Sequence, residues 1–343
     1  MRVSVGIARI CSLFGAGIDS IFRRWFFFAL LSVIAVYYLF LLSNGTFRIF
    51  APEMLDKVFN SMLVNLSHGD FTVDRKAISF EASIQDGKTY TYFGVFPALL
   101  RVAAIPFTDV AHAELARLSC LAAAVLFVAL QLWALVVVHN SLPIGSRRPG
   151  FLAIMVVATV LSGPQLYILA AAPIYHEPIL WSAAMGAAFN LIILRAALGG
   201  TGLSRRDLVW LAVLAGLALN TRASIGVALY LGTTLLLLWV AWSRHIHLAS
   251  GPSLLVRGAL LHRASPLVRD PSIVLPILVL GFFAVAAGIV NFGRWGNPFT
   301  FGGDIQYYYW IQRYPEMIAA IRNYGTFDFG RLWIGALYYA TGI

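Results

Sequence analysis

Long, almost uninterrupted apolar segments place the strongest limit on how this chain folds. There are seven of them, and an eighth begins near Leu332; they cover residues 25–43, 118–138, 151–169, 179–194, 208–219, 224–242 and 273–290. A helix needs roughly 20 apolar residues to cross a bilayer. Of 343 residues, 60% are hydrophobic and 12% are charged, against roughly 45–50% apolar residues in soluble domains. The sequence therefore predicts an all-α integral membrane protein with a bundle of about seven to eight transmembrane helices.

One apolar segment, residues 93–107, does not fit this pattern. Pro97 and Pro106 bracket a short run, and Arg101 near its middle would cost about 2.5–3.5 kcal/mol inside a bilayer. The loops 135–150, 195–207 and 244–270 carry two, three and four arginines. The loops between them, 167–178 and 220–223, carry none and one. The positive-inside rule therefore predicts that residues 93–107 lie on the outer face of the membrane without spanning it.

The same count orients the whole chain. Residues 25–43 follow Arg23 and Arg24, and no small-residue cleavage site follows them, so they are predicted to form an uncleaved anchor with a cytoplasmic N-terminus. The predicted location is the inner (plasma) membrane of a cell, with multiple passes. Basic residues on the inner face are an ordinary result of topology and anionic lipid, so the net charge of +10 indicates no nucleic-acid partner.

Residues 44–117 then form one large outer loop. Its first part carries a helical stripe of apolar side chains, with Pro52 at the start and Gly69 as a stop signal. The stripe consists of Leu55, Phe59, Met62, Leu63 and Leu66. This pattern predicts an amphipathic helix lying in the membrane interface.

Three features together resemble a known class of enzymes. They are the anchor followed by a large outer loop, the stretch QDGKTYTYFGVFPALLRVAAIPF (85–107) running on to RLSCLAAAVLFVALQLWALVV, and NFGRWGNPFTFGGDIQYYY (291–309). This arrangement resembles the GT-C superfamily of polytopic membrane glycosyltransferases. The resemblance implies one GT-C-like domain over residues 1–343, with juxtamembrane helices in the loop 44–117 and an outer loop rich in Gly and aromatics at 291–331. The sequence ends at ALYYATGI, still apolar and with no polar tail, so the chain is expected to continue beyond Ile343.

The resemblance further implies a reaction. Enzymes of this class move a sugar from a polyprenyl-phosphate carrier to a lipid or glycan acceptor at the outer face, usually with inversion and with a carboxylate as base. Better understood members place an aspartate directly after the first span. This chain has Asn44 there, and its first acid is Glu53. Because an amide cannot accept a proton as a carboxylate does, the base must come from a later acid.

Four acids of the outer loop are candidates. Asp86 ranks first because it precedes a tyrosine-rich stretch, although the Asp-Gly pair alone predicts a tight turn. Glu81 follows, in an alternating strand-like run whose exposed face is expected to be solvated. Asp56 is third, and on the amphipathic helix it is also expected to form a polar face with Lys57. Asp74, which has Arg75 beside it, ranks last.

Five other residues are candidates for donor binding. Arg222, in a turn between two spans, either snorkels to the interface or binds the carrier phosphate, for which a guanidinium is well shaped. His176 and Glu177 lie between two prolines in a short outer loop, where they either cap the next helix or bind a ligand. Arg294 and Asp304 lie among glycines and aromatics that either close over a sugar or form an interfacial belt.

Two alternatives to a transferase stay open. One is a lipid-linked sugar flippase or another transporter, although the spans carry few of the polar residues that transporters place at mid-membrane. The other is an inactive assembly scaffold, because the acid after the first span is missing. The chain has no GxxxxGK[ST], HExxH or CxxC pattern, and its two cysteines predict no disulfide framework. No cofactor is predicted with certainty, and the need for a divalent metal is left open.

Overall fold

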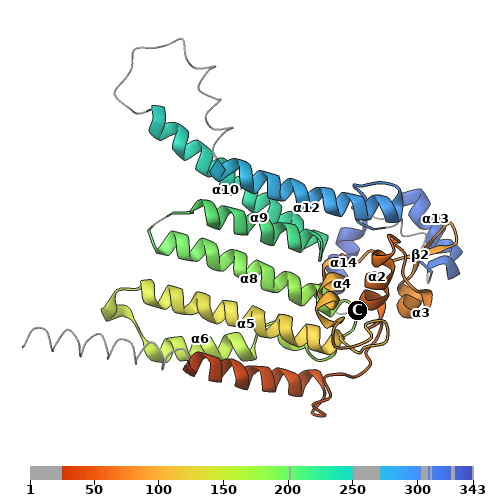
Figure 1. The fold of residues 1–343 in the computed structure, drawn as a ribbon, viewed down its shortest axis with the longest axis horizontal. Helices are drawn as coiled ribbons and strands as arrows, with labels where there is room; N and C mark the ends of the chain where they lie inside the picture. Colours follow the sequence, from red (N-terminus) through yellow and green to blue (C-terminus); the bar gives the residue numbers. More distant parts are fainter. Residues whose placement is uncertain are drawn as a thin grey trace, which may run out of the picture. The chain divides into compact units, whose positions relative to one another are not determined.

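A computed structural model describes residues 25–200, 202–249, 271–302, 308–309, 311–325 and 329–341 (Figure 1). The chain divides into two compact units, each made of two separate stretches. Unit 1 comprises Met1–Glu53 and Leu115–Asp207, and unit 2 comprises Met54–Glu114 and Leu208–Ile343. The chain thus leaves unit 1 after the first helix, forms residues 54–114 within unit 2, and returns. We keep the name outer loop for the segment 44–117 after its predicted position.

Unit 1 is a bundle of apolar helices. Its members are a first helix Trp25–Leu42, α5 (Ala116–Ser141), η3 (Ile144–Ser146), α6 (Pro149–Leu161), α7 (Gln165–Ile168) and α8 (His176–Leu198). α5 packs along α8 and also contacts α6. Small buried residues of α5, including Cys120, Ala123 and Ala124, allow its neighbours to approach closely, and Tyr38 and Leu42 of the first helix complete this core.

The third apolar segment is interrupted inside unit 1. α6 ends at Leu161 and α7 begins at Gln165, with a Gly-Pro pair between them. Proline has no N–H to donate, so carbonyls of the preceding turn lose their helical partner. The Tyr38 hydroxyl donates to the Val160 carbonyl (3.1 Å), and Gln165 Nε2 donates to the Thr159 carbonyl (2.7 Å). Side-chain donors therefore replace the lost hydrogen bonds of these backbone carbonyls. A segment inside a membrane requires such donors, because no water is available there.

Unit 2 combines apolar helices with the folded outer loop. The helices are α9 (Arg205–Leu219), whose first turn precedes the boundary of the unit, α10 (Ala223–Ala249) and α12 (Pro271–Trp295). Polar groups link them: Tyr230 donates to the Leu280 carbonyl (2.9 Å), and Asn220 Nδ2 donates to the Phe283 carbonyl (3.2 Å). Three shorter elements follow, namely η5 (Ile311–Arg313), α13 (Pro315–Tyr324) and α14 (Arg331–Thr341).

The outer loop contains short helices and a hairpin. Its elements are α2 (Val58–Ser67), α3 (Arg75–Ile78), η1 (Ser79–Glu81), β1 (Ser83–Gln85), β2 (Lys88–Tyr90), α4 (Phe96–Leu100) and η2 (Arg101–Ala104). β1 and β2 pair antiparallel, and the turn between them is Asp86-Gly87, with φ of 52° and 74°. Two successive positive φ angles are the signature of a tight hairpin turn that suits Asp-Gly. The predicted turn is therefore confirmed, and the chain adds this small sheet to an otherwise helical fold.

Six helices are long and apolar enough to cross a membrane within the described residues. They are Trp25–Leu42, Ala116–Ser141, Pro149–Ile168, His176–Leu198, Ala223–Ser243 and Ser272–Trp295. The expected span at residues 208–219 lies in α9, whose 15 residues extend only about 22 Å and begin with Arg205, Arg206 and Asp207. The described part of α14, where an eighth span was expected, has 11 residues. Residues 93–107 form the short elements α4 and η2, and neither has the length of a span.

The helix expected to lie in the membrane interface packs within unit 2. α2 begins at Val58, whereas Leu55 precedes it with a φ of 61°. Phe59 and Met62 are each 1% exposed, and α2 contacts α4 and η2. Protein therefore covers part of the apolar stripe, and the position of α2 at the membrane interface stays a prediction. The stop near Gly69 is confirmed, since α2 ends at Ser67.

Candidate functional site

Two carboxyl side chains meet beside α2. Asp56 is 8% exposed, and its side chain hydrogen-bonds that of Glu114. Lys57 Nζ lies 2.8 Å from Glu114 Oε1. The side-chain hydrogen bond with Asp56, followed by that from Lys57, lowers the pKa of Glu114.

A buried polar network fixes this pair. Lys57 Nζ also donates to the carbonyls of His112 (2.7 Å) and Ala113 (3.0 Å), so its three ammonium protons are all used. Asn60, fully buried, donates to the Ala113 carbonyl at 2.8 Å. Arg101, 3% exposed, donates to Asn60 Oδ1 at 3.4 Å and to the Pro97 carbonyl at 3.2 Å. These bonds tie the chain ahead of α5 to α2 and η2, and they hold Glu114 in place.

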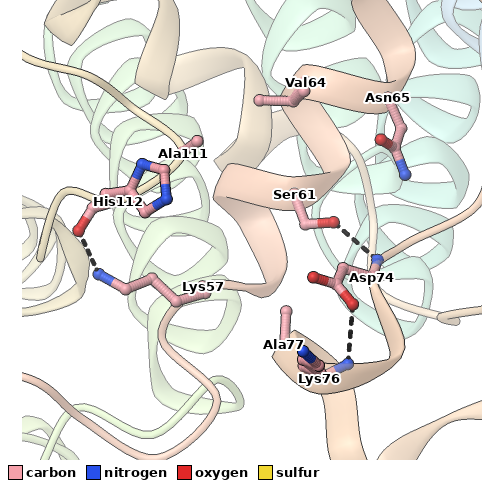
Figure 2. A pocket seen from close by; sticks show the side chains of 9 residues that line it. All are labelled: Lys57, Ser61, Val64, Asn65, Asp74, Lys76, Ala77, Ala111 and His112. Atoms are coloured by element: carbon pink, nitrogen blue, oxygen red, sulfur yellow. Dashed lines mark hydrogen bonds between the residues drawn. The ribbon is translucent and has the colours of Figure 1, made fainter.

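A pocket of about 400 Å³ opens beside Lys57 (Figure 2). Its lining comprises Lys57, Ser61, Val64, Asn65, Asp74, Lys76, Ala77, Ala111 and His112. Within it, Asp74 accepts a bond from the Lys76 backbone N–H (2.9 Å) and thereby begins α3. The pocket is large enough for a sugar-sized group, and Lys57, the ion-pair partner of Glu114, belongs to its lining.

The other two predicted base candidates lie near the hairpin. Asp86 is exposed at the tip of the turn. Glu81 is half-buried at the end of η1, and its negative charge contributes, after burial and Tyr92, to the raised pKa of Tyr308. Asp56 alone among the three ranked candidates is buried. Its expected position on an exposed helix face was wrong, because the chain reaches α2 through a turn that directs Asp56 inward.

Arg222 lies in the turn between α9 and α10, against residues 94–96. The Phe96 N–H donates to the Asn220 carbonyl (2.9 Å), and a Cβ at Gly94 would stand 2.2 Å from that same oxygen. Glycine is therefore required for the loop to reach this turn. The Arg222 side chain is half-buried, and its guanidinium has no hydrogen-bond or ion-pair partner within the described residues.

Arg294 is buried at the end of α12. It is 4% exposed, its Nη1 donates to the Phe93 carbonyl at 2.7 Å, and its Nη2 contacts the Met62 sulfur at 3.5 Å. Its Nε is buried and has no hydrogen-bond partner among the residues that the structure describes. The guanidinium thus fixes the outer loop to α12 rather than pointing into solvent. Asp304, proposed alongside it, lies outside the described residues.

The aromatic loop after α12 also contacts the hairpin. Tyr308 forms a β-bridge with Ser83, and its ring packs edge-on against Tyr92 with centroids 5.9 Å apart. The Tyr309 ring lies between Arg75 and Arg313, each 4.8 Å from its centroid. These cations position the ring by cation–π contacts. Within the described residues, the loop is therefore attached to the protein and is not simply an interfacial belt.

His176 and Glu177 are the first two residues of α8 in unit 1. This is the position at a helix start that the capping interpretation predicts. Their side chains make the following contacts. His176 Nδ1 bonds the Ala171 carbonyl (3.0 Å), whereas Glu177 is 1% exposed and accepts a bond from the Ser119 hydroxyl at 2.6 Å. Ser119 in turn accepts a bond from Trp181 Nε1 (2.9 Å). Glu177 thus joins α5 to α8, and the described residues contain no group of three or more His, Cys, Asp and Glu side chains that could hold a metal ion.

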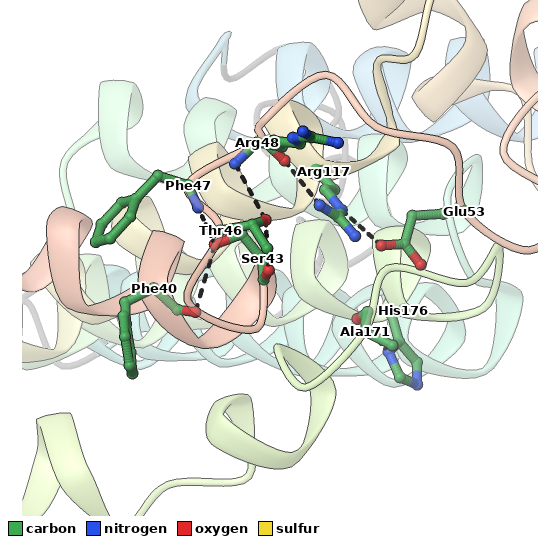
Figure 3. A network of polar contacts seen from close by, with 9 residues as sticks. All are labelled: Phe40, Ser43, Thr46, Phe47, Arg48, Glu53, Arg117, Ala171 and His176. Atoms are coloured by element: carbon green, nitrogen blue, oxygen red, sulfur yellow. Dashed lines mark hydrogen bonds and ion pairs between the residues drawn. The ribbon is translucent and has the colours of Figure 1, made fainter.

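A second ion pair closes the base of the outer loop (Figure 3). Arg117 Nε lies 2.6 Å from Glu53 Oε1, and the two side chains are 12% and 13% exposed. Arg117 Nη1 also donates to the Arg48 carbonyl at 2.7 Å. Glu53 and Arg117 flank the loop on either side, so this pair, which we call the loop clasp, holds together the points where the chain leaves unit 1 and returns.

Sequence reasoning missed Glu114 as a member of the site. It lies in the run DVAHAELARL, immediately before the second long span. This position next to a span resembles the one after the first span, where an acid was expected. That position was the available signal. Its pairing with Asp56 could not be read from the sequence, because it depends on the fold of the whole loop.

The six long apolar helices define the class: this is a multi-pass helical membrane protein with a folded, polar loop after its first helix. No family model, curated protein or solved structure matches the chain.

Proposed function

We propose that the protein is a membrane glycosyltransferase that moves a sugar from a polyprenyl-phosphate carrier to a lipid or glycan acceptor of the cell envelope. The observation that carries the proposal is the carboxyl pair of Asp56 and Glu114, held by Lys57 at the edge of the pocket in the outer loop. Sugar transfer with inversion requires a fixed carboxylate beside a space for sugar and acceptor, and this pair and pocket supply both.

Glu114 is the base in this proposal. Its lowered pKa keeps it ionised at neutral pH, so it is in the form that accepts a proton. A carboxylate of low pKa is a weak base towards a free hydroxyl. The acceptor oxygen becomes far more acidic as it bonds to carbon, however, so transfer late in the reaction is favourable. Asp56 orients Glu114 through the side-chain hydrogen bond between them.

The reaction is a single displacement. The acceptor oxygen forms a bond to the anomeric carbon, the bond from that carbon to the carrier phosphate breaks, and the phosphate leaves with the electron pair. The acceptor proton passes to Glu114. Arg222, with no partner within the described residues, would bind the leaving phosphate through its two parallel N–H donors.

The direct test uses purified protein, radiolabelled polyprenyl-phosphate sugars and cell-envelope acceptors, with and without a chelator. Transfer of label to an acceptor supports the proposal, and loss of transfer with chelator would add a metal to the site. Transport of the lipid-linked sugar across vesicles without any transfer would instead establish a flippase. Absence of both activities would favour a scaffold.

The phosphate site is tested separately with Arg222→Lys and Arg222→Ala. Lysine keeps the charge but loses the planar fork, so we expect weaker binding of polyprenyl phosphate in both variants, with the fold retained. Wild-type affinity in both variants would show that Arg222 only snorkels to the interface.

A further inference from the structure

A groove in unit 1 contains polar side chains at membrane depth. It has a volume of about 490 Å³ and lies between α5, α6 and α8. Its lining comprises Phe127, Gln131, Ala134, Leu135, Val138, Thr159, Ala183, Gly186, Ala187, Asn190 and Leu194. We call it the amide groove, because Gln131 and Asn190 are the side chains in it whose hydrogen bonds are not made within the described residues.

Both amides lie within helices that are long and apolar enough to cross a membrane. Asn190 precedes the end of α8 at Leu198 by eight residues, about 12 Å, and Gln131 precedes the end of α5 at Ser141 by ten, about 15 Å. Gln131 is half-buried and Asn190 is exposed. An amide without a hydrogen-bond partner is costly in hydrocarbon, so the groove calls for an occupant with hydrogen-bonding groups at this depth.

The need for hydrogen-bonding groups decides which kind of molecule can occupy the groove. Acyl and isoprenoid chains have no donors or acceptors at mid-membrane, so a lipid tail would leave both amides unsatisfied. A transmembrane helix with an amide or hydroxyl side chain satisfies them. A second copy of this chain brings the same amides to the same depth, and an asparagine is complementary to another asparagine because each offers both a donor and an acceptor.

The surface of α8 in the groove also suits close helix contact. Ala183, Gly186, Ala187 and Asn190 follow the spacing of one helical face. Small residues at this spacing let two membrane helices approach closely. Ala183 and Ala187 by themselves would indicate little, but here they flank an unsatisfied amide.

We propose that the amide groove is the interface between two copies of this chain. Both copies have the same orientation in the bilayer, so a two-fold axis along the membrane normal brings their α8 helices together in parallel. Asn190 then exchanges hydrogen bonds with Asn190 of the second copy, and Gln131 adds a further bond across the contact. The interface is independent of the proposed transferase site, which lies in the outer loop.

The structure offers a matched pair of variants as the test. A Cβ placed on Gly186 would have no atom within 4 Å, and the same holds for Gly281 in α12. Leucine at either position is therefore tolerated by the single copy, but only Gly186→Leu blocks the proposed contact. Asn190→Leu removes the amide without adding bulk at the glycine.

The measurement is energy transfer between differently labelled copies in lipid vesicles, over a range of protein-to-lipid ratios. We expect wild type to associate, Asn190→Leu to associate roughly three- to thirty-fold more weakly, Gly186→Leu to do so at least as weakly, and Gly281→Leu to match wild type. A thermal unfolding midpoint near that of wild type confirms that each variant folds.

Three results would overturn the proposal. They are a wild type that stays monomeric at every ratio, variants at Asn190 and Gly186 that associate as wild type does, and an equal loss in Gly281→Leu. If Gly186→Leu leaves association intact yet prevents binding of a polyprenyl-phosphate lipid, the groove holds a lipid tail instead, and the proposal also fails.

Discussion

Two acidic residues of the outer loop lie five positions apart and make ion pairs of nearly equal length. Asp109 Oδ2 lies 2.7 Å from His112 Nδ1, and Glu114 Oε1 lies 2.8 Å from Lys57 Nζ. Their surroundings differ, however. The side chains of His112 and Asp109 are 87% and 70% exposed, whereas those of Lys57 and Glu114 are 29% and 28% exposed.

The difference shows that distance alone does not identify a functional carboxylate. Water and salt screen an exposed pair, so most of its Coulomb energy is lost. Glu114 also contacts the side chain of the buried Asp56, and its neighbours cannot rearrange as freely as solvent does. Polar groups that are held in place in this way favour catalysis, because they need not reorganise at the moment of reaction.

The largest expected effect concerns the rate of sugar transfer. Glu114→Gln keeps the shape of the side chain but cannot accept a proton, so we expect transfer to fall by about 10²–10⁴. Asp56→Asn should lower the rate as well, because an amide changes the bond that orients Glu114. The comparison is made at equal protein abundance, with Asp109→Asn as the matched control. Full activity in Glu114→Gln would remove this pair as the source of the base.

The hairpin acids extend the same comparison. Asp86→Asn and Glu81→Gln remove carboxylates that are exposed or half-buried and lie away from the pocket lining. We expect both variants to transfer sugar at close to the wild-type rate. A loss in Asp86→Asn comparable to that in Glu114→Gln would restore the sequence-based ranking, in which Asp86 comes first.

The loop clasp tests what burial adds to stability. Arg117→Gln removes the ion pair of the largely buried Glu53 and the bond to the Arg48 carbonyl. We expect a loss of about 3 kcal/mol in the free energy of unfolding, measured in detergent micelles. The double variant Glu53→Gln/Arg117→Gln should recover part of this loss, since the buried negative charge is removed as well. Equal losses in the single and double variants would mean that the clasp acts by packing alone.

A smaller effect is expected at the hairpin turn. Gly87 has a φ of 74°, which disfavours any residue with a Cβ, and it has open space around it. Gly87→Ala should therefore cost about 1 kcal/mol of stability through backbone strain alone. Thermal unfolding, with Gly145→Ala in an open site without positive φ as the control, measures this cost. An unchanged midpoint in Gly87→Ala would show that the hairpin contributes nothing to the stability of unit 2.

The sequence predicted local features well, for physical reasons that particular residues make clear. Apolar runs identified the six long helices because hydrophobicity and length decide such segments directly. Asp86-Gly87 predicted its turn, and Gly69 the end of α2, because few residues adopt the backbone angles required there. Each of these features depends on a short stretch of chain.

Features that depend on distant stretches were not predictable. The stripe on α2 correctly indicated a buried face, but only the fold shows that α4 and η2 cover part of it. Asp56 was expected to form a polar face with Lys57 on the amphipathic helix, yet it meets Glu114 from the far end of the loop. Similarly, Arg294 was expected to bind a ligand, and it bonds the backbone of Phe93.

The smallest expected effect is at the exposed pair of Asp109 and His112, and it completes the comparison with Glu114. Hydrogen bonding to His112 lowers the pKa of Asp109, so any stabilisation is present above the usual pKa of aspartate and is lost as the pH falls through the lowered value. Because both side chains are highly exposed, we expect Asp109→Asn to leave the unfolding midpoint at neutral pH unchanged within error, at both low and high salt. Glu114→Gln, measured alongside, should lower the midpoint in a manner that salt affects little, since its partners are shielded. A clear, salt-sensitive loss in Asp109→Asn would show that contact length outweighs exposure in this loop.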